Sequence, residues 1–161
     1  MSEPRAMPQV QKKTYMGFSD GVGHDRIAVR TENPDGTFVT QPLTHYAKHS
    51  SEFSWSYAGS GPACTAFCIL ADFLQLVPLT KRAGMYGKGE IPEIACIYQD
   101  FKFDFIAPLP MGPNWEITSA QIAKWLLVHP LQTVCPNCRA DFDPTLGEPC
   151  WWCLPDPNEG E

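Results

Sequence analysis

Short stretches of alternating apolar and polar residues open the chain and predict β-strands. Residues 14–18 are expected to form a first strand, and residues 26–31 alternate as a half-buried strand does. Residues 33–36 (Asn-Pro-Asp-Gly) carry a strong turn signal, after which residues 37–42 resume as a strand. Together these segments predict an antiparallel β-hairpin.

The clearest helix follows an aromatic, serine-rich segment. Residues 53–57 alternate large aromatics with serines and predict a short strand or an extended approach. The apolar face of the helix that follows consists of Ala63, Phe67, Leu70, Leu74 and Val77. Ser60 suits its N-cap position, proline is tolerated in its first turn, and Pro78 is its expected end.

The second half of the chain predicts one more strand and one more long helix. Residues 91–100 fit either a helix or a strand, and an early proline and glutamate favour a short helix. The alternation of residues 101–106 predicts a strand. Thr118 and Gln121 match a capping box. The apolar stripe of the helix that they begin consists of Ile122, Trp125 and Leu126. The expected fold is therefore α+β, with a small, mainly antiparallel sheet packed by two helices.

Composition fits one domain with a small appendage. The chain has 161 residues, of which 43% are hydrophobic and 19% charged, so a packed core is expected rather than wholesale disorder. We expect a flexible lead (1–13), the α+β domain (14–130), a zinc ribbon or knuckle (131–154) and a disordered tail (155–161). A net charge of −6 disfavours strong, non-specific binding to nucleic acid. No apolar run has membrane-spanning length and residues 1–5 lack a signal-peptide core, so a cytosolic location is expected.

Four cysteines near the end of the chain have the spacing of a zinc site. The expected ligands are Cys135, Cys138, Cys150 and Cys153, in two pairs that each enclose two residues. Four thiolates close a tetrahedral site and leave no position for substrate, so the zinc is expected to be structural. A redox dithiol, paired disulfides or a rubredoxin-type iron centre use the same residues. Trp151 and Trp152, which lie between the last two ligands, either pack on the main domain or contact a partner.

The start of the first helix is a candidate site for a small anion. Amide donors and the positive end of the helix dipole meet there, and the two glycines of residues 59–63 (Gly-Ser-Gly-Pro-Ala) let a ligand approach the backbone. The expected ligand-binding residues are His45, His49, Trp55, Tyr57, Gly59, Ser60, Gly61 and Ala63. The alternative is that the same residues only form a well-capped helix.

Cys64 lies in the first turns of that helix, where a thiolate is stabilised. With His45 or His49 it could act as a cysteine–histidine nucleophile. The plainer interpretation is that Cys64, Cys68 and Cys96 pack inside as small apolar residues.

Several motifs of the chain recur in one family. They are residues 53–63 (Phe-Ser-Trp-Ser-Tyr-Ala-Gly-Ser-Gly-Pro-Ala), 98–102 (Tyr-Gln-Asp-Phe-Lys), 106–110 (Ile-Ala-Pro-Leu-Pro) and Trp115. Together they resemble a family of small, uncharacterised bacterial and phage proteins, domain of unknown function 6166, over about residues 14–128. The resemblance implies an accessory protein of bacteria, phages or mobile elements and supplies no activity. The four cysteines lie outside it.

The function expected from these features is that of a non-enzymatic binding protein. It would capture a small, nucleotide-like anion at the helix start, with Trp55 and Tyr57 stacking on a base, and could counter a host defence. One alternative is a protein–protein inhibitor or adaptor that uses the zinc unit on a host protein. Another is a cysteine–histidine enzyme, and a third, disfavoured by charge, is a nucleic-acid binder. An oligomer is compatible with the sequence.

Overall fold

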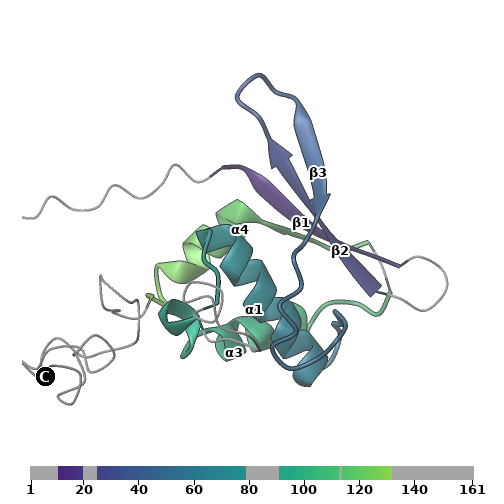
Figure 1. The fold of residues 1–161 in the computed structure, drawn as a ribbon, viewed down its shortest axis with the longest axis vertical. Coiled ribbons are helices and arrows are strands. Elements are labelled where there is room, and N and C mark those ends of the chain that lie inside the picture. The colour runs from purple at the N-terminus through teal and green to yellow at the C-terminus, as the bar shows by residue number, and fades with distance from the viewer. Residues whose placement is uncertain (1–10, 20–24, 79–90, 113, 132–161) are drawn as a thin grey trace, which may run out of the picture.

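The computed structural model describes residues 11–19, 25–78, 91–112 and 114–131. These residues form an antiparallel sheet against which the helices pack, with one hairpin of the sheet rising clear of the helices (Figure 1). The predicted α+β class is therefore confirmed. The predicted lead, zinc unit and tail lie largely or wholly outside the described residues.

The sheet has four strands, in the order β3-β2-β1-β4. Their bounds are β1 (Lys13–Ser19), β2 (Asp25–Glu32), β3 (Phe38–Pro42) and β4 (Glu116–Thr118). Each strand runs antiparallel to its neighbours, and Tyr15 in β1 is paired with Val29 on one side and Ile117 on the other. All three side chains are buried, because alternate residues point to the face that the helices cover.

The predicted hairpin is confirmed. β2 and β3 pair, and the turn between them is closed by the amide of Gly36, which donates to the carbonyl of Asn33 (3.0 Å). Gly36 has a φ of +86°, a conformation that glycine adopts at little cost, which explains the glycine at this position.

Helix α1 (Ser60–Leu74) runs through the centre of the molecule and is buried along most of its length. Its N-cap is Gly59 rather than Ser60, and the cap makes no side-chain hydrogen bond. The helix ends before the predicted Pro78, because Gln75 takes the left-handed conformation (φ 57°) that commonly terminates helices. The amide of Gln75 donates to the carbonyl of Asp72 (3.1 Å).

Residues 92–106 contain three short helical pieces. A 3-10 turn (Pro92–Ile94) is followed by helix α3 (Tyr98–Phe101) and a π-helical turn (Lys102–Ile106). The short helix expected within 91–100 is confirmed, and the strand predicted for 101–106 is wrong. Phe101 and Ile106 are buried five residues apart, as a π-helical turn allows, and the Phe101 and Phe105 rings stack at 4.7 Å.

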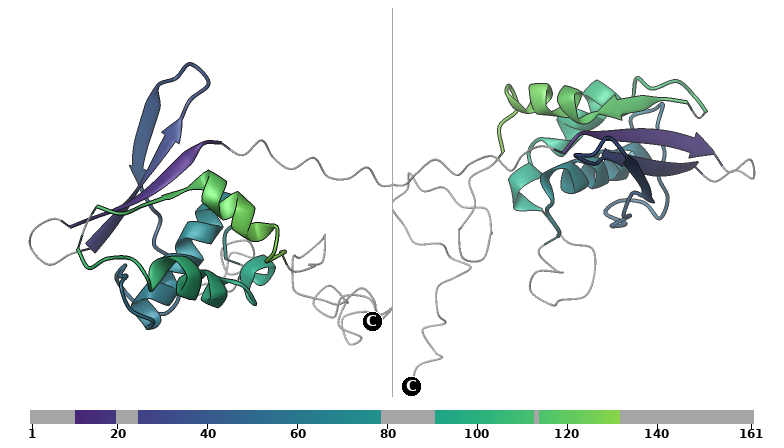
Figure 2. Two further views of the ribbon diagram at one scale, coloured as in Figure 1. Left: turned by 180° about the vertical axis from the view of Figure 1, so that it is seen from behind. Right: turned by 90° about the horizontal axis from the view of Figure 1, so that it is seen from above.

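Helix α4 (Ser119–Leu126) follows β4 directly. The predicted capping box is present: the amide of Gln121 donates to Thr118 Oγ1 (3.2 Å) and the amide of Thr118 donates to Gln121 Oε1 (2.9 Å). Ile122 and Trp125 are buried as expected. Two further views show α1 and α4 against the sheet from behind and from above (Figure 2).

Between β3 and α1 the chain forms a long irregular segment, residues 43–59. Of the two alternatives predicted for residues 53–57, the short strand is absent, and the chain approaches α1 without regular secondary structure. Parts of this segment fold against the first half of α1, where the amide of Ser54 donates to Thr65 Oγ1 (3.2 Å) and that hydroxyl donates to the carbonyl of Ser54 (2.8 Å). This segment carries most of the residues that the sequence singled out.

Candidate functional site

The aromatic residues near the start of α1 serve the fold. Trp55 is 4% exposed, its indole N–H donates to the carbonyl of Gly112 (2.9 Å), and its ring meets that of Trp115 edge-on at 5.2 Å. Stacking of Trp55 on a base would therefore require it to leave the core. Tyr57 is 54% exposed and is the more accessible of the two.

Tyr57 and Ser54 cover the two glycines of the helix start. Their hydroxyls are 3.0 Å apart. A Cβ added to Gly59 would lie 2.5 Å from the Tyr57 ring, and one added to Gly61 would overlap Ser54 Oγ. The close approach that requires glycine here is thus made by the protein's own side chains. Capture of a small anion at this turn stays a prediction, and the ligand would have to displace Tyr57.

The remaining predicted ligand residues lie apart from one another. Ser60 is exposed and Ala63 is buried at 2%. His49 bonds through Nε2 to the Tyr98 hydroxyl (2.6 Å) and stacks on that ring. His45 instead reaches Cys64, with 3.6 Å between Nε2 and Sγ. Of the two predicted histidines, His45 is the one that contacts the sulfur through its ring.

Cys64 Sγ is surrounded by hydrogen-bond donors. Besides His45, the backbone amides of Lys48 and His49 and the thiol of Cys68, one helical turn on, act on it as hydrogen-bond donors that lower its pKa. One acceptor lies nearby: the carbonyl of Ser50, 3.8 Å away, which a protonated Cys64 would bond. The donors outnumber this acceptor, so the surroundings favour the thiolate.

The tautomer of His45 follows from its other nitrogen. The amide of Ala47 donates to His45 Nδ1 (2.9 Å), and an amide N–H can only donate. Nδ1 is therefore the acceptor of the ring, and in neutral imidazole the proton then resides on Nε2. That N–H points to Cys64, so His45 acts as a donor to the sulfur and is not placed to take a proton from it.

A strained alanine shapes this loop. Ala47 has a φ of +50°, which an alanine adopts only at an energetic cost. Its own amide is directed to His45, while the next two amides, of Lys48 and His49, are directed to the sulfur. Successive amides that converge in this way form an anion-binding concavity. We call Cys64, His45 and the amides of Lys48 and His49 the thiolate nest.

The two cysteines of α1 have opposite pKa shifts. The pKa of Cys64 is lowered from 9.0 to about 5, chiefly by the hydrogen bond from Cys68 and further by His49, His45 and Lys48, against the opposing effect of burial. The pKa of Cys68 is raised, first by its hydrogen bond to Cys64 and then by burial. Cys64 is the thiolate of the pair and Cys68 its donor.

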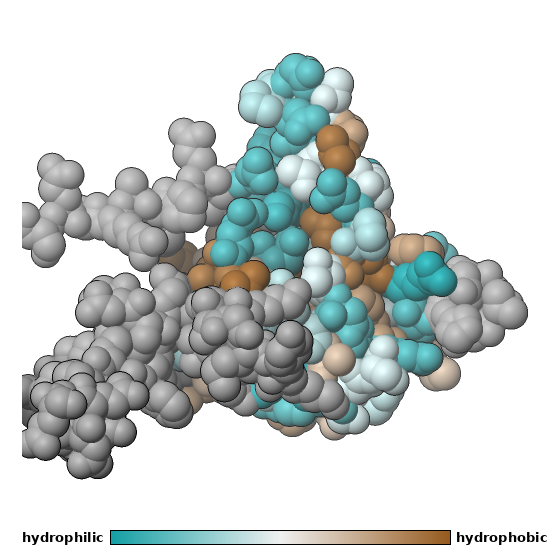
Figure 3. All heavy atoms as spheres, in the orientation of Figure 1, coloured by the Kyte–Doolittle hydropathy of each residue, from teal (hydrophilic) through white to brown (hydrophobic). Residues whose placement is uncertain are grey.

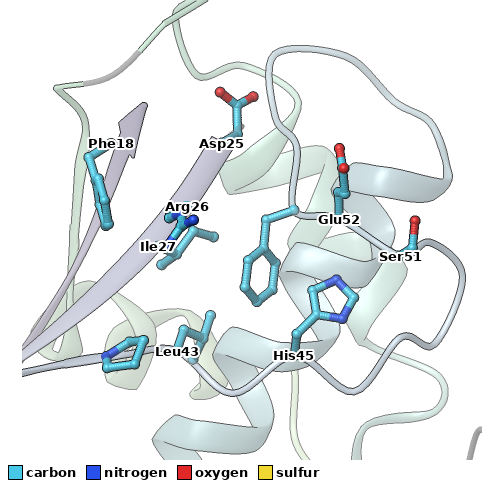
Figure 4. A pocket seen from close by; sticks show the side chains of 10 residues that line it. Phe18, Asp25, Arg26, Ile27, Leu43, His45, Ser51 and Glu52 are labelled. Atoms are coloured by element: carbon cyan, nitrogen blue, oxygen red, sulfur yellow. The ribbon is translucent and has the colours of Figure 1, made fainter. Parts of the chain in front are cut away.

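Both cysteines are fully buried, as the plainer interpretation of the sequence expects, whereas Cys96 is exposed and that part of the prediction is wrong. An open hollow of about 390 Å³ lies beside the nest (Figure 4). His45, Glu52 and Phe53 line one side of it and Ile27 of β2 the other. The rings of His45 and Phe53 are 4.4 Å apart. His45 therefore links this hollow to the sulfur.

Sequence reasoning named Cys64 and His45 but missed the amides. Their position depends on the backbone of Ala47, and an alanine carries no signal of a positive φ. The four predicted zinc ligands, from Cys135 to Cys153, lie outside the described residues. Within the described residues, no group of three or more His, Cys, Asp or Glu side chains is arranged to hold a metal ion.

Comparison with known proteins adds no relative: no family model, curated protein or solved structure matches the chain. Among the helices of the described segments, none is long and apolar enough to span a bilayer.

Proposed function

We propose that Cys64 is the functional group of this protein and that it acts as a thiol sensor of small oxidants of the peroxide class. The observation that carries the proposal is the thiolate nest, in which two amides and one imidazole N–H are directed to a single sulfur, which also accepts from the Cys68 thiol. A cysteine that only fills space has no need of such donors, since buried thiols are stable in the neutral form.

The reaction would be a displacement at oxygen. The Cys64 thiolate attacks one oxygen of the peroxide, an S–O bond forms, the O–O bond breaks and hydroxide leaves, to be protonated by water. The sulfur is oxidised to sulfenic acid and the peroxide is reduced. The N–H donors of the nest can bond the oxygen newly attached to sulfur, as they bond the sulfur itself.

Burial of the sulfur supports a small oxidant rather than a bulky substrate. Cys64 is fully buried, and the loop residues that contact its sulfur lie within residues 45–50, which form no helix or strand, so a reagent enters where this loop yields. His45 has no proton acceptor free for a substrate, because Nδ1 is occupied by the amide of Ala47. General-base catalysis of the cysteine–histidine hydrolase type is therefore less well supported than direct reaction of a thiolate.

The test is to treat the folded protein with hydrogen peroxide, trap sulfenic acid with dimedone, and locate the adduct by peptide mass spectrometry. Exposed Cys96 provides an internal reference. The proposal predicts faster labelling at Cys64 than at Cys96, although Cys64 is buried. Labelling of Cys96 with none at Cys64 would mean that reactivity follows exposure, and the proposal would be wrong.

A matched variant separates the nest from the sulfur alone. His45→Phe keeps an aromatic ring beside Phe53 and removes the Nε2–H donor. We expect slower oxidation of Cys64 in this variant and no change at Cys96. His49→Phe is the control, because its ring bonds Tyr98 and its contribution to the nest is a backbone amide.

A further inference from the structure

The β2–β3 hairpin presents an unusual sheet edge. All five residues of β3 are exposed, and none of them is charged. Exposed edge strands of proteins that stay single are normally protected by charged side chains, bulges or cover. Within β3 the one such feature is Pro42 at its end.

The hydrogen-bond pattern shows which groups of β3 are free. The amide of Leu43 donates to the carbonyl of Ile27 (2.9 Å), and that of Asn33 donates to the carbonyl of Thr37 (2.7 Å). Hydrogen-bonded pairs alternate with non-bonded ones along an antiparallel ladder. Between these two ends, the bonded residues of β3 are therefore Val39 and Gln41.

The intervening residues direct their backbone groups away from β2. Phe38 and Thr40 each present an N–H and a C=O to the free edge, whereas Pro42 presents a C=O alone. The edge also carries apolar surface, since Phe38 is 57% and Val39 43% exposed. In the space-filling view the hairpin is mainly hydrophilic and carries a few separate hydrophobic spheres (Figure 3), and the ribbon shows it standing clear of the helices (Figure 1).

We infer that β3 pairs with β3 of a second copy of this chain, antiparallel, about a twofold axis at Val39. Phe38 of each copy then lies opposite Thr40 of the other, and the two exchange both N–H···O=C bonds. Every outward donor of Phe38 and Thr40 is used, and Pro42 falls beyond the pairing, so its missing N–H costs nothing.

The same register is self-complementary in side chains. Val39 meets Val39 of the second copy as a non-hydrogen-bonded pair, where Cα atoms approach to about 4.5 Å. On the other face of the paired strands, Phe38 of one copy covers Thr40 of the second copy. No like charges face each other in these strands. One strand pair is smaller than a standard interface, so the dimer should be weak and dependent on concentration.

Cysteine cross-linking tests the register. In Val39→Cys the two thiols lie within disulfide distance across the axis. In the control Gln41→Cys, on the same strand and face, they lie about 13 Å apart, because four residues of strand separate them. We expect a cross-linked dimer from V39C under mild oxidation and none from Q41C beyond the wild-type level. Equal cross-linking of the two variants would overturn the inference.

Sedimentation velocity tests the dimer itself. Wild-type protein should shift from monomer to dimer as its concentration rises. Val39→Lys and Val39→Glu keep the strand's backbone bonds and should each remain monomeric, whereas a mixture of the two should dimerise. A wild-type protein that stays monomeric at millimolar concentration would refute the pairing and leave the edge to an extended segment of another protein.

Discussion

The pH dependence of Cys64 alkylation tests the thiolate nest most directly. The perturbation is a change of pH from 5 to 9 in the presence of iodoacetamide, which reacts with thiolates and not with thiols. The pKa of Cys64 in the folded protein is about 5, against 9.0 for an ordinary thiol. The folded protein should therefore hold Cys64 as a thiolate over almost the whole range.

The expected magnitude follows from the two pKa values. With a pKa of about 5 the thiolate fraction rises from about 0.9 at pH 6 to nearly 1 at pH 9, so the rate should stay within about 10%. With an ordinary pKa of about 9, the fraction would rise by a factor of about 500 between the same limits. Burial lowers the alkylation rate but does not change its pH dependence. When the loop opens in rapid equilibrium, the open thiolate is a constant proportion of the closed thiolate at every pH.

The assay is mass spectrometry of the tryptic peptide that carries Cys64 after timed quenching. The control is the same chain in guanidinium chloride, in which the nest is absent and the rate should climb about tenfold per pH unit. A tenfold climb per unit in the folded protein as well would show that the sulfur is an ordinary buried thiol. The donors around the sulfur would then not hold Cys64 as a thiolate.

The same shift makes stability depend on pH. The pKa of Cys64 is depressed on folding, so its contribution is present above the unfolded pKa of about 9 and is lost as pH falls toward about 5. The pKa of Cys68 is raised, so its contribution is lost as pH rises above its ordinary value. Between about pH 5 and 9 the free energy of unfolding should therefore rise with pH by about 1.4 kcal/mol per unit, and this slope comes from Cys64. Urea melts of the wild type and Cys64→Ala at several pH values should show this slope in the wild type alone.

Three substitutions test other parts of the structure. Gly17→Ala would place a Cβ inside the buried Trp115 ring and should lower the free energy of unfolding by about 1–3 kcal/mol in urea melts, and an unchanged midpoint would refute that packing. Gln75→Gly relieves the left-handed end of α1 and should raise stability by about 0.5–1 kcal/mol, seen as a higher Tm. Cys150→Ser should abolish the zinc that we expect, one ion per chain by plasma mass spectrometry, and leave the helical circular dichroism of residues 60–74 largely intact. Loss of the whole fold in that variant would contradict the division into two units.

The strands of the hairpin and helix α1 were predictable because each has a regular pattern and clear ends. The alternation in β2 matches one buried face, and the turn at residues 33–36 sets the return. Strand β4 could not be predicted, since its three residues gain their strand character from pairing with β1. The local sequence pattern predicts an element correctly where tertiary contacts favour the same element. It gives no prediction for an element, such as β4, that forms only through those contacts.

Residues 101–106 show how a pattern can mislead. Phenylalanine at every second position imitates a strand, yet no neighbouring strand is available among the described residues and the chain continues as a helix. Phe101 and Phe105 stack along that helix, while Phe103 remains 56% exposed. Three phenylalanines at every second position therefore differ in burial: one is buried, one exposed and one partly buried. The sequence pattern does not distinguish them, and only the tertiary structure does.

The thiolate nest differs from ordinary packing because two of its features would each destabilise the fold if they occurred alone. A positive φ at Ala47 costs energy, and so does a buried charge on Cys64. Each cost is offset by the other feature. The strained turn at Ala47 directs two amides to the sulfur, and the hydrogen bonds from these amides stabilise its negative charge. A glycine at 47 would remove the cost of the positive φ, and a neutral side chain at 64 would remove the cost of the buried charge. The presence of both unfavourable features at one sulfur therefore supports a role for the thiolate beyond stability.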